Sequence, residues 1–97
     1  RKRVITARKI QAKRYKNDGI LTNSELTSKL IRKYCQIDKA SAELLKMAVV
    51  KYQLSGRRYD RVLKLARTIA DLDNSENIQQ THLMQALQYR MFNSLSN

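Results

Sequence analysis

The chain has 97 residues, of which 20 are Lys or Arg and 8 are Asp or Glu, so its formal net charge is +12. This length suits one small domain. With 42% hydrophobic residues the chain is too apolar for a disordered polycation, and no apolar run approaches the roughly 20 residues of a transmembrane helix. The first residues are also too polar for a signal peptide, so we expect a soluble, cytoplasmic protein with no membrane partner.

The composition favours helices over strands. The chain contains no proline and only two glycines, which leaves few residues for the tight turns of a many-stranded sheet. We therefore predict an all-α fold, a small bundle of four to five helices. The single cysteine excludes an internal disulfide, and with one histidine the usual zinc ligand sets cannot be assembled, so we expect no metal site in this chain.

Residues 1–16 carry eight basic side chains and no acidic one, which is two thirds of the net charge. The pattern over 4–16 is weakly amphipathic and predicts a first helix, ended by the turn formers at 17–19, of which the glycine suits a left-handed cap. A basic helix of this kind is typical of nucleic-acid binding. The candidate contacts are Lys9, Lys13 and Arg14. A helix that packs on an acidic surface, or is simply solvated, explains the same charges equally well.

Two helices are predicted in the middle of the chain. Thr22 and Glu25 have the spacing of a capping box, which predicts that a second helix begins at Thr22 and ends near Cys35, a small buried residue. Asp38 is a suitable cap for a third helix that is apolar on more than one side, and we expect this helix to be the centre of the core. Its apolar residues are Ala42, Leu44, Leu45, Met47, Ala48, Val49 and Tyr52.

A fourth helix is predicted from the cap Ser55 to about Leu72. Its expected buried face consists of Tyr59, Val62, Leu63, Ala66, Ile69 and Ala70. Its expected i,i+4 ion pairs are Asp60 with Lys64 and Arg67 with Asp71. After a polar loop, Ile78 is expected to enter the core before a fifth helix, near whose start His82 has a surface or capping role. The apolar residues of that helix are Leu83, Met84, Leu87 and Met91.

The sequence LSGRR at 54–58 is the most informative local feature. The chain has no Gly-rich phosphate loop with acids for magnesium, so it contains no complete NTPase site. If Ser55 caps the fourth helix, Arg57 lies in the first turn, where the helix dipole opposes its charge. A bound anion would remove this conflict, because free backbone N–H groups and a guanidinium together form a phosphate-binding corner. The alternative is that Arg57 and Arg58 are solvated surface residues.

Several motifs along the chain occur together. They are VITARKIQAKR at 4–14, LKLARTIADL at 63–72 and HLMQALQYR at 82–90. Ser55 and Arg57 are a serine-arginine pair at the start of a long helix, and Cys35 and Asp38 are spaced as in a C-x-L-D junction with Ile37 in place of leucine. With these motifs, most of the chain resembles the C-terminal end of the magnesium-chelatase-like AAA+ ATPases of the ComM/YifB family.

The resemblance implies that residues 1–19 are the last helix of an AAA+ core and 20–97 the helical lid of a larger ATPase. It implies that Arg57 is the sensor-2 arginine, which contacts the γ-phosphate of ATP, with Arg58, where the family has a small residue, as a possible second contact. ATP and Mg belong to the longer protein, and we expect this chain alone to bind neither tightly and to have no activity.

The partners implied are the core of the same polypeptide and the neighbouring subunits of a hexameric ring, in a DNA-processing motor associated with competence and similar to branch-migration helicases. Two other hypotheses stay open: a free-standing basic helical module that binds nucleic acid, and a helical adaptor for an acidic partner.

Overall fold

The computed structural model describes the backbone of residues 2–96 and the side chains of residues 2–90. Within this range the all-α prediction is confirmed, because the chain is 73% helical and its only β-contact is one isolated bridge between Ile37 and Ile78. None of the helices described is long and apolar enough to cross a membrane. The elements are α1 (Lys2–Arg14), the 3-10 turn η1 (Asn23–Glu25), α2 (Ser28–Tyr34), α3 (Lys39–Tyr52), α4 (Gly56–Leu72) and α5 (Gln80–Ser96).

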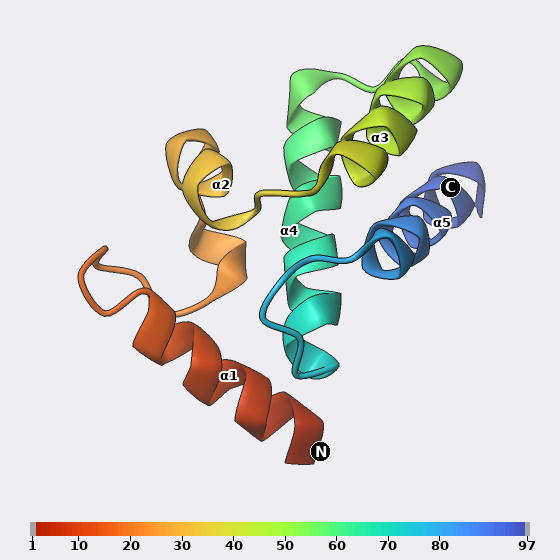
Figure 1. Ribbon diagram of the computed structural model, residues 1–97. Helices are drawn as coiled ribbons and strands as arrows, with labels where there is room; N and C mark the ends of the chain where they lie inside the picture. Colours follow the sequence, from red (N-terminus) through yellow and green to blue (C-terminus); the bar gives the residue numbers. More distant parts are fainter. Residues whose placement is uncertain (1, 97) are drawn as a thin grey trace.

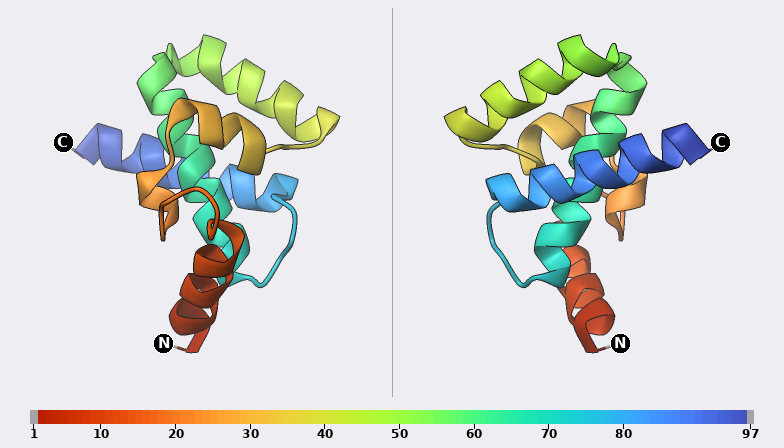
Figure 2. Two further views of the ribbon diagram at one scale, coloured as in Figure 1. Left: turned by 90° about the vertical axis from the view of Figure 1, so that its left-hand side faces the viewer. Right: turned by 90° about the vertical axis from the view of Figure 1, so that its right-hand side faces the viewer.

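Helix α4 is the central element of the bundle (Figure 1). It contacts α1, η1, α2 and α5, whereas α3 packs mainly on α5. The views of Figure 2 show α5 crossing α4, with α1 at the C-terminal end of α4 and α3 near its N-terminal end. The two ends of α4 are therefore held by different parts of the chain.

Polar side chains begin the helices largely where the sequence indicates. The carboxylate of Asp38 accepts a hydrogen bond of 2.7 Å from the backbone N–H of Ser41, which lowers the pKa of Asp38. The hydroxyl of Ser55 accepts one of 3.3 Å from the N–H of Arg58. The prediction for the second helix is wrong at its start, because Thr22 precedes only η1, and α2 is capped by Thr27.

The core is centred on α4 rather than on α3. Val62, Leu63, Ala66 and Ala70 of α4 are buried, as predicted, whereas Tyr59 is exposed. The four buried residues of α4 belong to a hydrophobic cluster that also includes Leu45, Ile78, Leu83 and Ala86.

The expectation that α3 is the centre of the core is wrong. Of its predicted apolar residues, Leu45 and Ala48 are buried, but Met47 is 68% exposed and Tyr52 is also exposed. A helix whose main neighbour is one other helix can bury only one of its apolar faces.

The start of α5 is held by a buried histidine. His82 is 2% exposed, so the surface role predicted for it is wrong. Its Nδ1 accepts a hydrogen bond of 2.9 Å from the N–H of Gln79, which confirms the capping role, and its Nε2 lies 3.0 Å from Oδ2 of Asp73. The predicted burial of Ile78 and Leu87 is confirmed, but Met84 is 44% exposed. The side chain of Met91 lies outside the described residues.

Helix α1 packs on the C-terminal half of α4 through one side. Ala7 and Gln11 are buried, and Tyr15, directly after the helix, is completely buried. The predicted left-handed turn is confirmed at Gly19, whose φ is +73°. The remaining surface of α1, including Lys9 and most of its other basic side chains, faces solvent.

Candidate functional site

Ser55 caps the start of α4 as the sequence predicts, so Arg57 lies in the first turn of the helix. The hydroxyl of Ser55 accepts a hydrogen bond from the backbone N–H of Arg58, and the carbonyl of Ser55 accepts one from the N–H of Tyr59. The N–H groups of Gly56 and Arg57 have no acceptor among the described residues. Two backbone donors and the positive end of the helix dipole are therefore available at this point.

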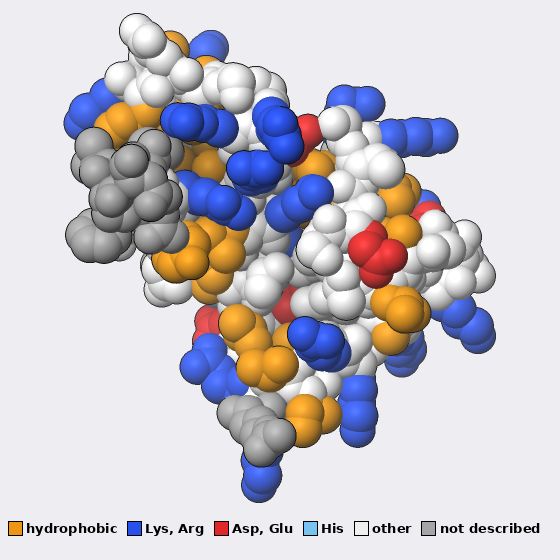
Figure 3. Space-filling model, turned by 180° about the vertical axis from the view of Figure 1, so that it is seen from behind, with side chains coloured by type: hydrophobic (Ala, Val, Ile, Leu, Met, Phe, Trp, Pro, Cys, Tyr) orange, Lys and Arg blue, Asp and Glu red, His pale blue; other side chains and the backbone are white. Residues whose placement is uncertain are grey.

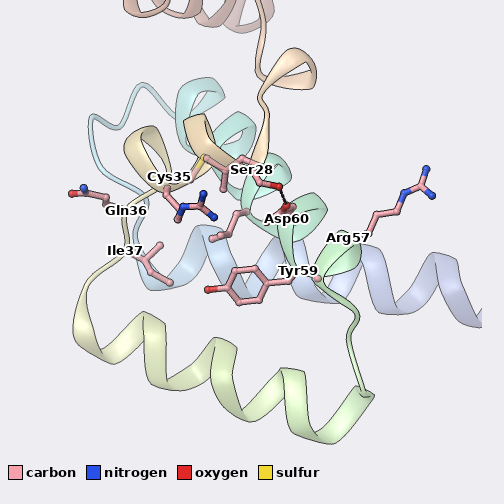
Figure 4. Close-up of a pocket in the computed structure, with 11 residues that line it drawn as sticks. Ser28, Cys35, Gln36, Ile37, Arg57, Tyr59 and Asp60 are labelled. Carbon is pink, nitrogen blue, oxygen red and sulfur yellow. Dashed lines mark hydrogen bonds between the residues drawn. The ribbon is translucent and has the colours of Figure 1, made fainter.

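Arg57 lies at the edge of a groove of about 900 Å³ between α2 and α4. Figure 4 shows its guanidinium directed away from the other labelled residues, toward solvent. Within residues 2–90 it forms no ion pair or hydrogen bond. The Arg57 side chain is therefore exposed at the edge of the groove and unpaired among the described residues.

The lining of the same groove carries charges of both signs, since it includes Arg32 as well as Asp60. Asp60 points into it and accepts a hydrogen bond of 2.6 Å from the hydroxyl of Ser28 (Figure 4). A carboxylate at this place would repel a phosphate, so the candidate site is the outer edge at Arg57. The predicted pair of Asp60 with Lys64 is not formed, because Lys64 instead donates to the carbonyl of Ser24 at 3.4 Å.

Further basic side chains accompany Arg57 on the same helix. Arg58 and Arg61 are exposed, and Arg57, Arg61 and Lys64 line a smaller depression beside Thr27. In Figure 3 basic side chains gather on the upper half of the face shown, with few acidic ones among them. This part of the described surface therefore carries an excess of positive charge.

The three candidate nucleic-acid contacts at 9, 13 and 14 differ in their exposure. Lys9 and Lys13 are exposed. Arg14 is not available in the same way, because its Nη2 lies 2.6 Å from Oδ1 of Asp71 and its Nη1 lies 3.1 Å from Oδ2. The prediction for Arg14 is therefore corrected: its guanidinium forms an internal ion pair with a fully buried carboxylate.

The sequence indicates the pairing of Arg67 with Asp71 but not its burial. The pair is present at 3.1 Å, and the side chains of Arg67 and Asp71 are 5% and 0% exposed. Burial alone would lower the pKa of Arg14, but its hydrogen bonds to Asp71 and Tyr15 outweigh this and raise it. For the contribution of Arg14, the sequence shows a basic residue near the end of a helix, and it does not identify Asp71 as the partner.

No metal-binding group is found in the part of the chain that the structure describes, where no three His, Cys, Asp or Glu residues lie together. Cys35 is buried, as predicted, and burial raises the pKa of its thiol to about 11. A thiol that stays protonated at neutral pH is a poor nucleophile and a poor metal ligand.

These features define the chain as an all-helical domain with a cationic helix start. Residues 1–90 match the family model described as magnesium chelatase, subunit ChlI C-terminal, and the chain belongs to this family.

Curated relatives include the uncharacterized protein YifB of Escherichia coli, which is 38% identical over 98% of this chain, and the competence protein ComM of Haemophilus influenzae, which is 41% identical over 93%. The uncharacterized protein Rv2897c of Mycobacterium tuberculosis is 36% identical over 74% of the chain. The matched parts are 18%, 17% and 14% of these relatives, respectively, so the chain spans less than a fifth of their length.

Proposed function

We propose that this chain is the C-terminal helical lid of a magnesium-chelatase-like AAA+ ATPase, in which Arg57 is the sensor-2 arginine. The observation that carries the proposal is the exposed Arg57 in the first turn of α4, beside two backbone N–H groups without an acceptor among the described residues. A cation at this end of a helix is unfavourable unless an anion is bound. The γ-phosphate of ATP is such an anion, and a planar guanidinium can hold two of its oxygens.

In this proposal ATP and Mg are held by a nucleotide-binding core outside this chain, and the lid supplies one cationic contact. While the γ-phosphate is present, Arg57 ties the lid to the core. After hydrolysis this contact is lost and the lid is released. The core of the same polypeptide and the neighbouring subunits of a hexameric ring are the proposed partners, and residues 1–19 are proposed as the connection to the core.

The experiment compares variants in the longer protein that contains this segment. Arg57→Ala is expected to reduce ATP turnover by about a hundredfold, since a single well-placed donor to a transition-state oxyanion contributes this much. Arg61→Ala, which removes an exposed arginine one turn later, is the matched control and is expected to retain turnover. The melting curve of the isolated chain with Arg57→Ala checks that folding is intact. Normal ATPase activity of the folded Arg57→Ala variant would disprove the role of Arg57, and the same assay on Arg58→Ala shows whether Arg58 makes the contact instead.

We further propose that the motor acts on DNA. Lys9 and Lys13 are exposed on α1, in a segment with eight basic residues and no acidic one, which supports contact with a polyanion. The same observation favours the second candidate function, a basic module that binds nucleic acid without an ATPase core.

A titration with a labelled DNA duplex tests this surface directly. Binding by the isolated chain is expected to weaken steeply between about 50 and 200 mM salt, and the combined variant Lys9→Gln and Lys13→Gln should reduce the slope of log K against log salt by about 2. Lys39→Gln with Lys46→Gln, which removes two exposed charges from α3, is the control of equal charge. Absence of binding at low salt, or an equal effect of the two double variants, argues against a DNA contact on α1.

A further inference from the structure

A buried cluster of charged and polar side chains lies where α1, η1 and α4 meet, at the opposite end of α4 from Arg57. Its centre is the fully buried carboxylate of Asp71, whose Oδ1 lies 2.6 Å from Nη2 of Arg14 and 3.1 Å from Nη2 of Arg67. The Oδ2 atom accepts hydrogen bonds from Nη1 of Arg14 at 3.1 Å and from Nδ2 of Asn23 at 3.0 Å. One carboxylate therefore joins a residue of α1, a residue of η1 and a residue of the preceding turn of its own helix.

The residues around Asp71 extend these connections. The side-chain amide of Asn23 also donates to the hydroxyl of Thr68 at 3.0 Å, and its carbonyl accepts from the hydroxyl of Tyr15. The backbone N–H of Asn23 donates to the amide oxygen of Gln11 at 3.2 Å. Gln11, Tyr15 and Asn23 are each at most 5% exposed. Helix α1 is bonded to α4 through Arg14, and η1 is bonded to α4 through Asn23. Neither element can therefore shift without breaking buried hydrogen bonds.

This chemistry fixes orientation as well as distance. The two nitrogens of the Arg14 guanidinium meet the two oxygens of one carboxylate, a geometry that is lost on small rotations. Breaking the pair would leave a buried charge with fewer partners, which is strongly unfavourable. A purely apolar contact between the same helices would tolerate sliding far better, so the cluster gives α1 one defined position on α4.

We infer that Asp71 is a positioning residue that makes α1, η1 and α4 one rigid unit. Helix α4 has 17 residues, and a helix of that length spans about 25 Å. Arg57 at one end of α4 therefore keeps a fixed position relative to α1 at the other end, and a displacement of α1 carries Arg57 with it. A hinge at residues 19 and 20, the boundary that the family resemblance implies, would have to break this cluster. The inference holds whether or not Arg57 binds a phosphate.

The distance between two spin labels, measured by pulsed electron paramagnetic resonance on the isolated chain, tests the inference. The labels replace exposed residues through Lys9→Cys on α1 and Arg61→Cys on α4, in a Cys35→Ala background. One narrow distance distribution is expected for this parent. Arg14→Gln is expected to broaden it by about twofold or more, because α1 then samples several positions on α4.

Two further variants make the result decisive. Arg8→Gln removes an exposed arginine from the same helix and is expected to leave the distribution unchanged. Arg14→Lys keeps the charge without the two-nitrogen geometry and is expected to give an intermediate width; it decides the question if circular dichroism shows that Arg14→Gln does not fold. A broad distribution in the parent, or equal widths for the Arg8 and Arg14 variants, would overturn the inference. Because the readout involves no nucleotide, it is independent of the role proposed for Arg57.

Discussion

The exposed outer face of α3 leads to a prediction about stability for which the structure and the sequence pattern give different results. Leu45 and Met47 are two residues apart on α3, and both are among the apolar residues that the sequence predicts for the core, but Leu45 is 1% exposed and Met47 is 68% exposed. Truncation of a buried leucine to alanine costs about 3 kcal/mol, because it removes apolar contacts and leaves a cavity. Met47 buries about a third of its side chain, so its truncation should cost less than about 1 kcal/mol, partly offset by the better helix propensity of alanine.

Urea unfolding monitored by circular dichroism measures both effects. A domain of this size has a free energy of unfolding of about 5–15 kcal/mol, so the Leu45→Ala variant should still fold. With a urea dependence of about 1.5 kcal/mol per molar, Leu45→Ala should lower the midpoint by about 2 M and Met47→Ala by less than about 0.7 M. Leu83→Ala and Met84→Ala on α5 form a second pair with the same contrast in exposure, 0% against 44%. Equal destabilisation by Leu45→Ala and Met47→Ala would refute the reasoning and restore α3 as the centre of the core.

Two further predictions concern the glycines and the cysteine. Gly19→Ala should destabilise the chain by about 1 kcal/mol, because φ at this position is +73°. Gly56→Ala should stabilise it by about 0.5 kcal/mol, since the residue is helical and no atom lies within 4 Å of the added Cβ. Thermal melts of both variants measure these changes. The pKa of Cys35 is about 11 when folded, against an ordinary value of 9.0, so the folded chain holds this proton more tightly than the unfolded chain. The free energy of unfolding relative to Cys35→Ala should therefore be constant below pH 9 and decrease between about pH 9 and 11; a difference that does not change with pH would contradict the burial of the thiol.

The local features of the fold could be predicted because they depend on neighbours in sequence. Ser55 and Asp38 begin helices since a side-chain oxygen three residues before a free N–H can accept its hydrogen bond. The buried face of α4 could be predicted because its apolar residues recur with the period of a helix and its opposite face is basic. Position 57 follows directly from the cap, so the candidate anion site could be located without the fold.

The features that depend on tertiary contacts could not be predicted in the same way. Thr22 has the spacing of a capping box, but the chain leaves helical geometry after η1, since η1 lies against α4 and Asn23 is bonded to Gln11 and Asp71. The apolar residues of α3 show that the helix has two apolar sides without showing which of them the chain covers. Periodicity gives the faces of a helix, whereas the number of neighbours decides how many of them are buried.

The role of Arg14 shows why charge counts alone assign partners poorly. In the sequence it is one of eight basic residues that favour a polyanion, and nothing distinguishes it from Lys9 or Lys13. In the structure its side chain is 16% exposed and its partner is a carboxylate 57 residues away. This carboxylate is fully buried, and Arg14 and Arg67 are both paired with it. The positive charges that remain for an external partner are therefore exposed ones, such as Lys9 and Lys13 on α1 and Arg57 and Arg61 on α4. The two helices that carry these groups are joined by the carboxylate of Asp71.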